Sequence, residues 1–333
     1  MPWSLAVLLF AAAQLIPGLR SSGPDPQAAF HIDSDLIPRP AQYAFADVRL
    51  PHRVGSGFVL PGETVRVEIV DGGVPAAYLL LPQGGVARPV GPRAWEWTAP
   101  LSPGVVRMLA VDSLGLDTMR IQAFVMVPFA DVKGGMLNGF RIGHYPAERE
   151  IGGVRYARPR GFVELTADNL DTPISPHFRI GQFDCRQSEK YPRYVVVAQP
   201  LVTKLEAIVD GLGRSGHQVP TLGIMSGYRT PWLNAAKGNV RYSRHQYGDA
   251  VDFFVDADAD GRMDDLNGDG KVNTADARTL QCVIENLAVD SREDIRPGGL
   301  GTYRWSQMHG PFVHTDARGF RTRWGASAGC GGG

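Results

Sequence analysis

Ser243-Arg-His-Gln-Tyr-Gly-Asp-Ala-Val-Asp252 is the stretch that decides the fold, together with the later segment Phe312-Val-His-Thr-Asp316. Asp252 lies in an apolar run that alternates as a strand does, and an unpaired carboxylate on such a face is costly. His245 precedes it in a turn that contains glycine, and the later segment adds His314. Two imidazoles and a carboxylate are the ligand set that zinc takes when one position is left for water. The pattern predicts a metal site suited to hydrolysis.

The chain has the composition of an ordinary globular protein. Of its 333 residues, 44% are hydrophobic and 20% are charged, which allows a sizeable core and more than one domain. Lysine and arginine (34) balance aspartate and glutamate (34), so no net field would gather polyanions. We therefore expect small or neutral substrates and no nucleic-acid partner.

An apolar run at the N-terminus, Trp3–Ile16, stops at Pro17-Gly18. It is too short to span a bilayer comfortably but has the length of a signal-peptide core. No lysine or arginine precedes it, which leaves a mis-assigned start or a short membrane anchor as alternatives. We expect residues 1–22 to be a signal peptide or N-terminal anchor. The protein would then be exported, to the periplasm or outside the cell, with any membrane anchoring confined to this segment.

The chain contains three cysteines. In an exported protein Cys185 and Cys282 could form a disulfide, whereas Cys330 lies alone in the glycine-rich segment 326–333, which is expected to be a flexible tail. The alternative is three free thiols, because the sequence does not give the separation of the side chains.

The first half of the sequence predicts an all-β domain at 40–133, of the immunoglobulin-like sandwich type. Four segments are rich in β-branched residues and are separated by glycine and proline turns: Thr64–Val70, Ala77–Leu81, Val105–Val111 and Thr118–Val127. The domain carries no cluster of histidine, cysteine or paired acids, so we expect a binding or spacing role. Residues 134–174, with several glycines and prolines, are expected to be a linker.

The second half mixes a helix with short strands. Pro200–Leu212 places its apolar residues on one helical stripe, and strands are expected at Thr221–Met225, Ala250–Val255 and Phe312–Thr315. This mixture predicts an α+β domain at 175–325.

Several motifs of this half resemble one family when they are taken in order. The pattern S-x-H-x-x-G-x-A-x-D is present without a gap, and the other motifs flank it: Ser226–Thr230, Gly298–Gly301, Tyr303 and Phe312–Gly319. Together they are similar to the zinc D-Ala-D-Ala carboxypeptidases and murein endopeptidases, whose α+β fold is also seen in Hedgehog signalling domains. The resemblance covers about half of the chain, from residue 175 to residue 325.

The resemblance implies roles for individual residues. His245, Asp252 and His314 would bind zinc at about 2.0–2.2 Å, and the remaining position would hold a water whose pKa falls towards 7. Arg229 matches the arginine of the family's Ser-Gly-Tyr-Arg motif, which would meet a substrate carboxylate or the developing oxyanion. The alternative for Arg229 is a salt bridge that closes its turn.

The general base is where the sequence departs from better-known members, some of which carry glutamate or histidine shortly before the third ligand. Phe312 stands two residues before His314, and the nearest titratable residue upstream is His309. Asp316 is the other candidate, about 7 Å from His314 on the same face of a strand. We favour Asp316 as an acceptor that orients His314 over Asp316 as a base. His309 is also compatible with a surface loop, so the base stays unassigned.

An acidic insertion, residues 256–276, lies between the second and third metal ligands. It contains the pattern D-x-N-x-D-G-x-x-N-x-x-D, which resembles a dockerin-type or EF-hand-like calcium loop, and its expected ligands are Asp265, Asn267, Asp269, Lys271, Asn273 and Asp276. A second, overlapping pattern could add Asp256, Asp258, Asp260 and Asp264. We expect a structural calcium site that holds the insertion, and the alternative is a solvated acidic loop.

The sequence thus predicts an exported zinc peptidase with Zn²⁺ and Ca²⁺ as cofactors. Its substrate would be a D-amino-acid-containing peptide of peptidoglycan, which it would cleave as a carboxypeptidase or an endopeptidase. The first alternative is a catalytically inactive module that binds zinc and calcium and recognises peptidoglycan or a protein. A second alternative makes the calcium loop the working part of a surface adhesion protein.

Overall fold

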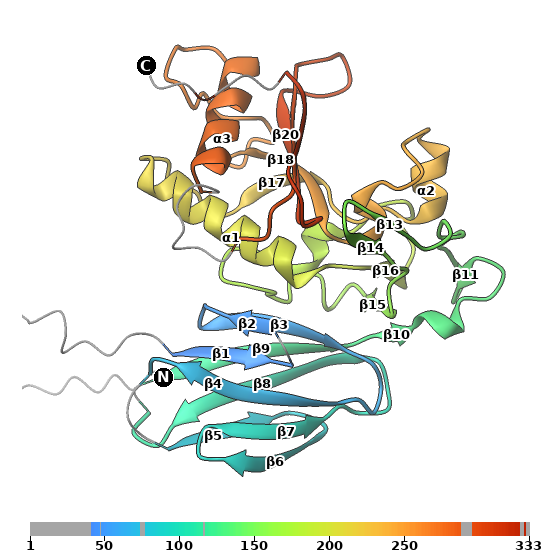
Figure 1. The fold of residues 1–333 in the computed structure, drawn as a ribbon, viewed down its shortest axis with the longest axis vertical. Helices are drawn as coiled ribbons and strands as arrows, with labels where there is room; N and C mark the ends of the chain where they lie inside the picture. The colour runs from blue at the N-terminus through green and yellow to red at the C-terminus, as the bar shows by residue number, and fades with distance from the viewer. Residues whose placement is uncertain are drawn as a thin grey trace, which may run out of the picture. The chain divides into compact units, whose positions relative to one another are not determined.

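The computed structural model describes residues 41–46, 48–73, 77–115, 117–287, 295–326 and 330 (Figure 1). The expected signal peptide at 1–22 lies outside the described residues, as does most of the expected tail at 326–333. Among the described helices, none is both long and apolar enough to cross a membrane.

The first part of the described chain forms two β-sheets. One is antiparallel, in the order β2 (Val48–Leu50), β1 (Gln42–Phe45), β4 (Thr64–Asp71), β7 (Ala94–Thr98) and β6 (Val86–Gly91). The other has the order β3 (Val54–Val59), β9 (Thr118–Val125), β8 (Gly104–Asp112) and β5 (Tyr78–Pro82), with β3 and β9 parallel. Strands β4, β5, β8 and β9 lie where the sequence predicts strands.

The two sheets share one core because their strands alternate between buried and exposed side chains. In β4 the buried positions are Val65, Val67 and Ile69, as period-2 alternation requires. They join a single cluster with Trp97 of the same sheet and Ile121 of the other.

A second hydrophobic core lies in the later part of the chain, between the helices and sheets described below. The segment 134–174, expected to be a linker, instead contributes buried side chains to this second core, among them Leu137, Phe140 and Ile174. Its elements are short: β11 (Met136–Leu137), β12 (Phe140–Arg141), β13 (Arg149–Ile151), β14 (Val154–Tyr156) and β15 (Gly161–Leu165). Strand β15 pairs on one side with β10 (Val127–Pro128) and on the other with β16 (Arg193–Val195). The expectation of a linker was wrong because strands this short leave no visible periodicity.

A five-stranded sheet carries the candidate site. Its order is β17 (Leu222–Ser226), β18 (Ala250–Val255), β20 (Phe312–Asp316), β19 (Gly299–Tyr303) and β21 (Thr322–Gly325), and β19–β21 is its parallel pair. Helices α1 (Gln199–Arg214) and α3 (Thr274–Leu287) lie on one side of it, with α3 packed on β18, β19 and β20 (Figure 1). The short helix α2 (Pro231–Ala236) follows β17. This arrangement agrees with the α+β expectation.

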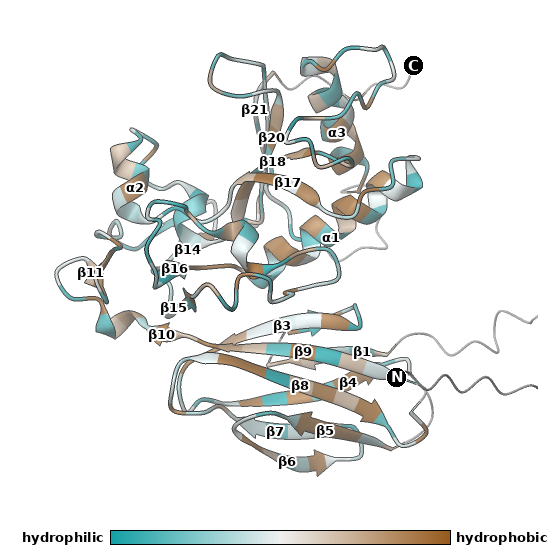
Figure 2. Ribbon diagram, turned by 180° about the vertical axis from the view of Figure 1, so that it is seen from behind, coloured by the Kyte–Doolittle hydropathy of each residue, from teal (hydrophilic) through white to brown (hydrophobic). Residues whose placement is uncertain are grey.

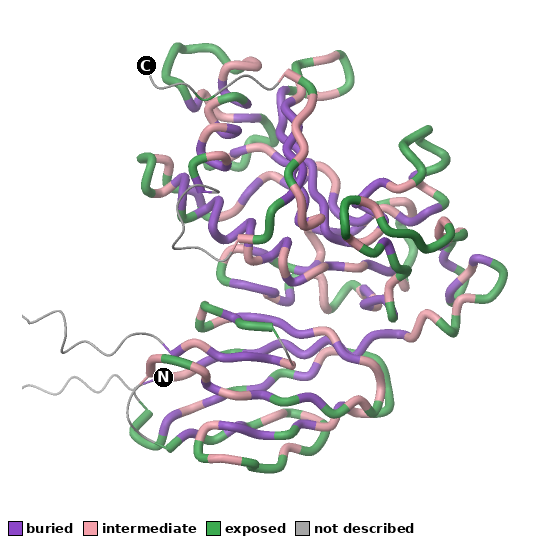
Figure 3. The backbone as a smooth tube through the Cα atoms, viewed as in Figure 1, coloured by how far each residue is buried: buried purple, intermediate pink, exposed green. Residues whose placement is uncertain are grey.

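Apolar residues follow the covered face of this sheet. Figure 2 shows hydrophobic residues along its strands and along α1, and Figure 3 shows that the same elements are largely buried. Helix α1 begins with Pro200 in its first turn, where a missing N–H costs nothing, and buries Leu201, Leu205 and Ile208. The opposite face of the sheet carries Asp252 and His314, which belong to the candidate site.

The disulfide joins Cys282, on α3, to Cys330, with their Cα atoms 5.4 Å apart, and Cys185 is free. The suggested pairing of Cys185 with Cys282 was therefore wrong. Cys185 is instead partly buried against the second core. Cys330, near the end of the chain and expected in a flexible tail, is tied to α3.

Candidate metal centre

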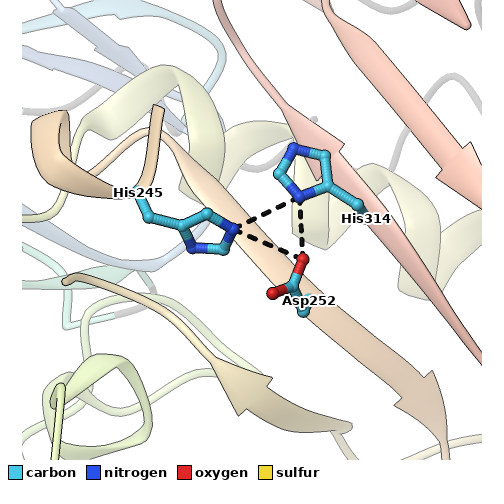
Figure 4. A group of neighbouring side chains, drawn as sticks. All are labelled: His245, Asp252 and His314. Carbon is cyan, nitrogen blue, oxygen red and sulfur yellow. Dashed lines mark hydrogen bonds and ion pairs between the residues drawn. The ribbon is translucent and has the colours of Figure 1, made fainter. Parts of the chain in front are cut away.

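Three side chains from separate elements converge at one point (Figure 4). His245 lies on the 3-10 helix η4 (Arg244–Tyr247), Asp252 on β18 and His314 on β20. One ligand atom from each lies within 4.8 Å of the other two, and all three residues are buried.

The separations between these atoms fit a single cation. His245 Nε2 lies 3.3 Å from Asp252 Oδ1 and 3.3 Å from His314 Nδ1, and His314 Nδ1 lies 2.7 Å from the same carboxylate oxygen. In a tetrahedral zinc site with bonds of about 2.0–2.1 Å, neighbouring ligand atoms lie about 3.3 Å apart. The donor set therefore has the size and the chemistry of a zinc site with one position left for water.

The register of the central strands brings Asp252 and His314 together. They are directly opposite each other in the antiparallel pair β18–β20, so their side chains leave the same face of the sheet. A bulge in β17 then places Ser226 opposite Asp252 on the other side.

Gly248 turns the chain from η4 into β18. Its φ of 72° lies in the left-handed region, and a Cβ at this position would lie 2.4 Å from the carbonyl oxygen of Val196. The glycine of the pattern is thus required by the backbone, and it fixes the position of His245 relative to Asp252.

Each imidazole is held through the nitrogen that does not face the centre. His245 Nδ1 lies 2.7 Å from the carbonyl oxygen of Gly227, which leaves Nε2 for a cation. His314 Nε2 lies 3.3 Å from Asp316 Oδ2, which leaves Nδ1 for the same cation. Such partners select the tautomer and the ring orientation that a metal needs.

Asp316 is fully buried, and its carboxylate is occupied. Arg318 Nε lies 2.9 Å from both of its oxygens, and the Gly299 N–H donates to Oδ1 at 2.8 Å. This is the arrangement of an acceptor that orients His314. It leaves no oxygen of Asp316 to take a proton from water.

The pKa values of the metal-free centre follow from burial and from shared carboxylates. Burial lowers the pKa of His245. Burial acts in the same direction on His314, but hydrogen bonds to Asp252 and Asp316 outweigh it and raise the pKa of His314 to about 9. Burial would raise the pKa of Asp252, yet the two imidazoles hold it well below its usual range. A cation at the centre would replace a proton on His314.

Arg229 holds the carboxylate oxygen that faces away from the histidines. Its Nη2 pairs with Asp252 Oδ2, and its Nε donates to Ser226 Oγ at 2.8 Å. Its side chain also lines the cleft described next. The structure thus places Arg229 in an ion pair with a candidate metal ligand, at the edge of the space where a substrate would lie.

An open cleft of about 910 Å³ leads to the centre, and we call it the metal cleft. One wall is aromatic: Tyr303 stacks on Phe312 with ring centroids 4.4 Å apart, and His309 meets the edge of Phe312 at 4.9 Å. His309 is therefore part of the cleft wall, where its Nδ1 lies 2.8 Å from the carbonyl oxygen of Gly310.

Sequence reasoning missed Trp324 and Arg318, which also line the metal cleft. The Trp324 ring lies 5.1 Å from His314, and its Nε1 donates to the Tyr303 hydroxyl at 2.9 Å. A Cβ on Gly301 would lie 2.3 Å from that indole nitrogen. Glycines alternating in a strand indicate that something approaches the backbone closely, and this signal could have revealed the site for a large ring.

The acidic insertion contains one group of carboxylates that could hold a cation. Asp256, Asp258 and Asp260 each offer an oxygen within 4.8 Å of the others. Asp264 accepts the Ala257 N–H at 2.9 Å beside this group.

The other expected calcium ligands serve mainly the turns of their own loop. Asp265 accepts the N–H groups of Gly268, Asp269 and Gly270. Asn267 Oδ1 accepts from Asp269, and Asp269 Oδ1 accepts from Lys271. Within the described residues, the carboxylates of Asp265, Asp269 and Asp276 form no group like that of the upstream loop.

Asp276 and Asn273 cap helix α3. Asn273 Oδ1 accepts the Ala275 N–H at 2.8 Å, and Asp276 Oδ2 accepts the Asn273 N–H at 2.7 Å, which together satisfy free donors of the first turn. Asp276 Oδ1 also accepts from Leu266 and Asn267. Both oxygens of Asp276 are therefore engaged by backbone.

A protein-family model matches part of the chain. The comparisons with curated proteins and with solved structures found no match. The match includes His245 and Asp252 and ends inside the acidic insertion, before His314. The family model described as Peptidase M15 matches residues 176–267, and together with the His/Asp/His centre it supports an M15-type zinc peptidase domain in this chain.

Proposed function

We propose that the protein is an exported zinc metallopeptidase that hydrolyses D-amino-acid-containing peptides of peptidoglycan. The observation that carries the proposal is the convergence of His245, Asp252 and His314 at the head of an open cleft. The chemistry that zinc supplies when bound there is a Lewis acid beside the carbonyl and an acidified water.

The chain's own residues would prepare that chemistry. The Gly227 carbonyl and the Asp316 carboxylate hold the two imidazoles in position, and Arg229 holds the outer oxygen of Asp252. The stacked rings of Tyr303 and Phe312 form an apolar wall on one side of the cleft. His309, in the same wall, is the remaining imidazole that could carry a proton to or from a substrate.

The charges of the metal cleft support a substrate with free carboxylates. Arg244 and Arg318 are paired with Asp249 and Asp316, whereas a zinc ion together with Arg229 would outweigh the single negative charge of Asp252 and leave the cleft positive. Lys237 adds a further positive charge to the lining. Peptidoglycan peptides carry such carboxylates, and a positive cleft raises their local concentration.

The test is hydrolysis of defined muropeptides, with mass analysis of the products and zinc content measured on the same sample. We expect one zinc per chain and cleavage beside a D-amino acid, with both lost in His245→Ala. His217→Ala, outside the metal cleft, is the matched control and should keep both. Zinc binding without turnover of any muropeptide would favour the alternative, a module that binds peptidoglycan. Phe312 also favours this alternative, because it is apolar and stands two residues before His314, where a general base would be expected.

We also propose that calcium binds the upstream loop of the insertion. The support is the group of Asp256, Asp258 and Asp260, because clustered oxygens are the ligands that calcium prefers. Titration with terbium, followed by its luminescence, should show one site that Asp258→Ala removes.

Export, for which the apolar segment Trp3–Ile16 is the support, is tested by sequencing the N-terminus of the mature protein recovered from the periplasm or the medium.

A further inference from the structure

A second cavity lies beside the metal cleft, and we call it the distal hollow. Its volume is about 370 Å³, and its principal lining residues are Met225, Phe254, Arg262, Met263, Trp305 and Pro311. None of these residues binds the proposed metal. Two of the walls come from segments outside the sheet: the acidic insertion supplies Arg262 and Met263, and the loop between β19 and β20 supplies Trp305 and Pro311.

The distal hollow continues the metal cleft. Met225 lines both cavities, and His309 of the loop and Phe312 at the start of β20 line the cleft, while Pro311 between them lines the hollow. Phe254 follows Asp252 by two residues in β18, so it lies on the same face of the sheet, about 7 Å further along. An extended peptide covers that distance in about two residues.

The floor of the hollow is apolar and built into the sheet. The Phe254 ring lies over Gly223 of β17, where a Cβ would come within 2.7 Å of it. Met263 is 3% exposed, whereas Trp305 is 65% exposed and so presents an uncovered ring. Such surfaces bind the aliphatic part of a ligand.

One basic group stands at this apolar site. The backbone N–H of Arg262 is bonded to Asp260, but its guanidinium makes no ion pair or hydrogen bond with any described residue. The carboxylates of Asp256, Asp258 and Asp260 accept backbone N–H groups of their own loop, and they do not line the hollow. An unpaired guanidinium beside an apolar floor recognises a carboxylate at the end of an aliphatic chain.

We propose that the distal hollow is a substrate subsite for a long aliphatic side chain that ends in a carboxylate, about two residues from the bond that is cut. The assignment rests on the proposed peptidase function. Diaminopimelate in a peptidoglycan stem peptide has this chemistry, whereas lysine has the same aliphatic stem without the carboxylate.

The experiment compares two stem peptides that differ only in diaminopimelate or lysine at that position. The wild-type zinc protein should prefer the diaminopimelate peptide by about tenfold or more in kcat/KM, the effect of one charge-assisted hydrogen bond. Arg262→Ala should remove this preference by slowing only the diaminopimelate peptide. Arg304→Ala, an exposed neighbour that lines neither cavity, should leave the preference intact.

A second variant tests the apolar part of the hollow. Trp305→Ala should raise KM for both long side chains but leave a peptide with alanine at that position unchanged, and this selectivity separates a lost contact from misfolding. Equal turnover of both long peptides by the wild type, with no effect of Arg262→Ala, would overturn the subsite and leave the peptidase function standing. No turnover of any peptide by the zinc-loaded wild type would overturn both.

Discussion

Trp324 shows how single residues shape the metal centre. Its indole lies across Gly299 and Gly301, where Cβ atoms would lie 2.6 Å and 2.3 Å from ring atoms, and it reaches His314. The hydrogen bond from its Nε1 to Tyr303 joins it to the aromatic wall of the metal cleft. The two glycines on β19, which have no side chains, thus make room for one large side chain beside a candidate metal ligand.

Gly301→Ala should displace this ring. The new methyl group would overlap the indole, and overpacking of this kind costs about 1–3 kcal/mol of stability. We expect a lower midpoint of thermal unfolding and a shifted tryptophan emission. Gly91→Ala is the control, since its Cβ would make an ordinary contact of 3.6 Å with Ala94. An unchanged midpoint and spectrum would show that Trp324 does not depend on Gly301.

Asp316→Asn should weaken zinc binding without removing a ligand. The change takes away the charge that faces His314 Nε2, and loss of such an acceptor costs about 10–100-fold in metal affinity. Competition with a chromophoric chelator measures the affinity directly. Asp316→Asn also takes the charged partner from Arg318. Asp249→Asn does the same to the buried Arg244 and therefore serves as the control for the loss of an ion pair. Equal zinc affinities of the two variants would contradict an orienting role for Asp316.

At the scale of elements, the insertion is anchored by the start of helix α3. Asp276 is fully buried and accepts backbone N–H groups from Leu266, Asn267 and Asn273. The disulfide from Cys282 ties the same helix to Cys330. The helix therefore connects the loop of the insertion to the sheet that carries two of the candidate metal ligands, Asp252 and His314.

Asp276→Ala should destabilise the protein even in the presence of a chelator. It leaves buried backbone donors unsatisfied, which costs about 1–3 kcal/mol for each group that finds no other partner. Unfolding by urea in chelator and in calcium separates this effect from metal binding. The exposed Asp258→Ala should matter only in calcium. A loss of stability for Asp276→Ala that appears only in calcium would make Asp276 a ligand rather than a cap.

The sequence predicted the parts of the site whose chemistry depends on residue type and spacing. His245, Asp252 and His314, which the structure brings together, were predicted from a carboxylate on an apolar strand, from the two histidines near it and from the order of the motifs that resemble the family. Trp324 was missed because its role depends on which strands are neighbours, and β21 pairs with β19 only in the folded sheet. The disulfide partner of Cys282 was missed for the same reason: the distance between two thiols is set by packing.

At the scale of the whole molecule, the metal-free centre links stability to pH. The folded-state pKa of His314 is about 9, above the unfolded value of about 6.5, because Asp252 and Asp316 favour its charged form against the effect of burial. A raised folded pKa gives stability that is fully present below pH 6.5 and is lost as the pH rises through 9. The loss is on the order of 3 kcal/mol. Lys204, whose pKa burial lowers to about 8, acts in the opposite direction.

Zinc should therefore stabilise the protein more as the pH rises from 6.5 to 8.5. Binding replaces the proton of His314, so the affinity increases about tenfold for each pH unit in this window. The measurement is urea unfolding with zinc and with chelator at each pH. Lys204 contributes equally to the stability of the zinc-bound and zinc-free forms, so its contribution drops out of the difference between the two curves. Calorimetry in buffers of different ionisation enthalpy should show about one proton released per zinc. If the gain in unfolding free energy on adding zinc stays constant from pH 6.5 to 8.5, His314 is already neutral before zinc binds.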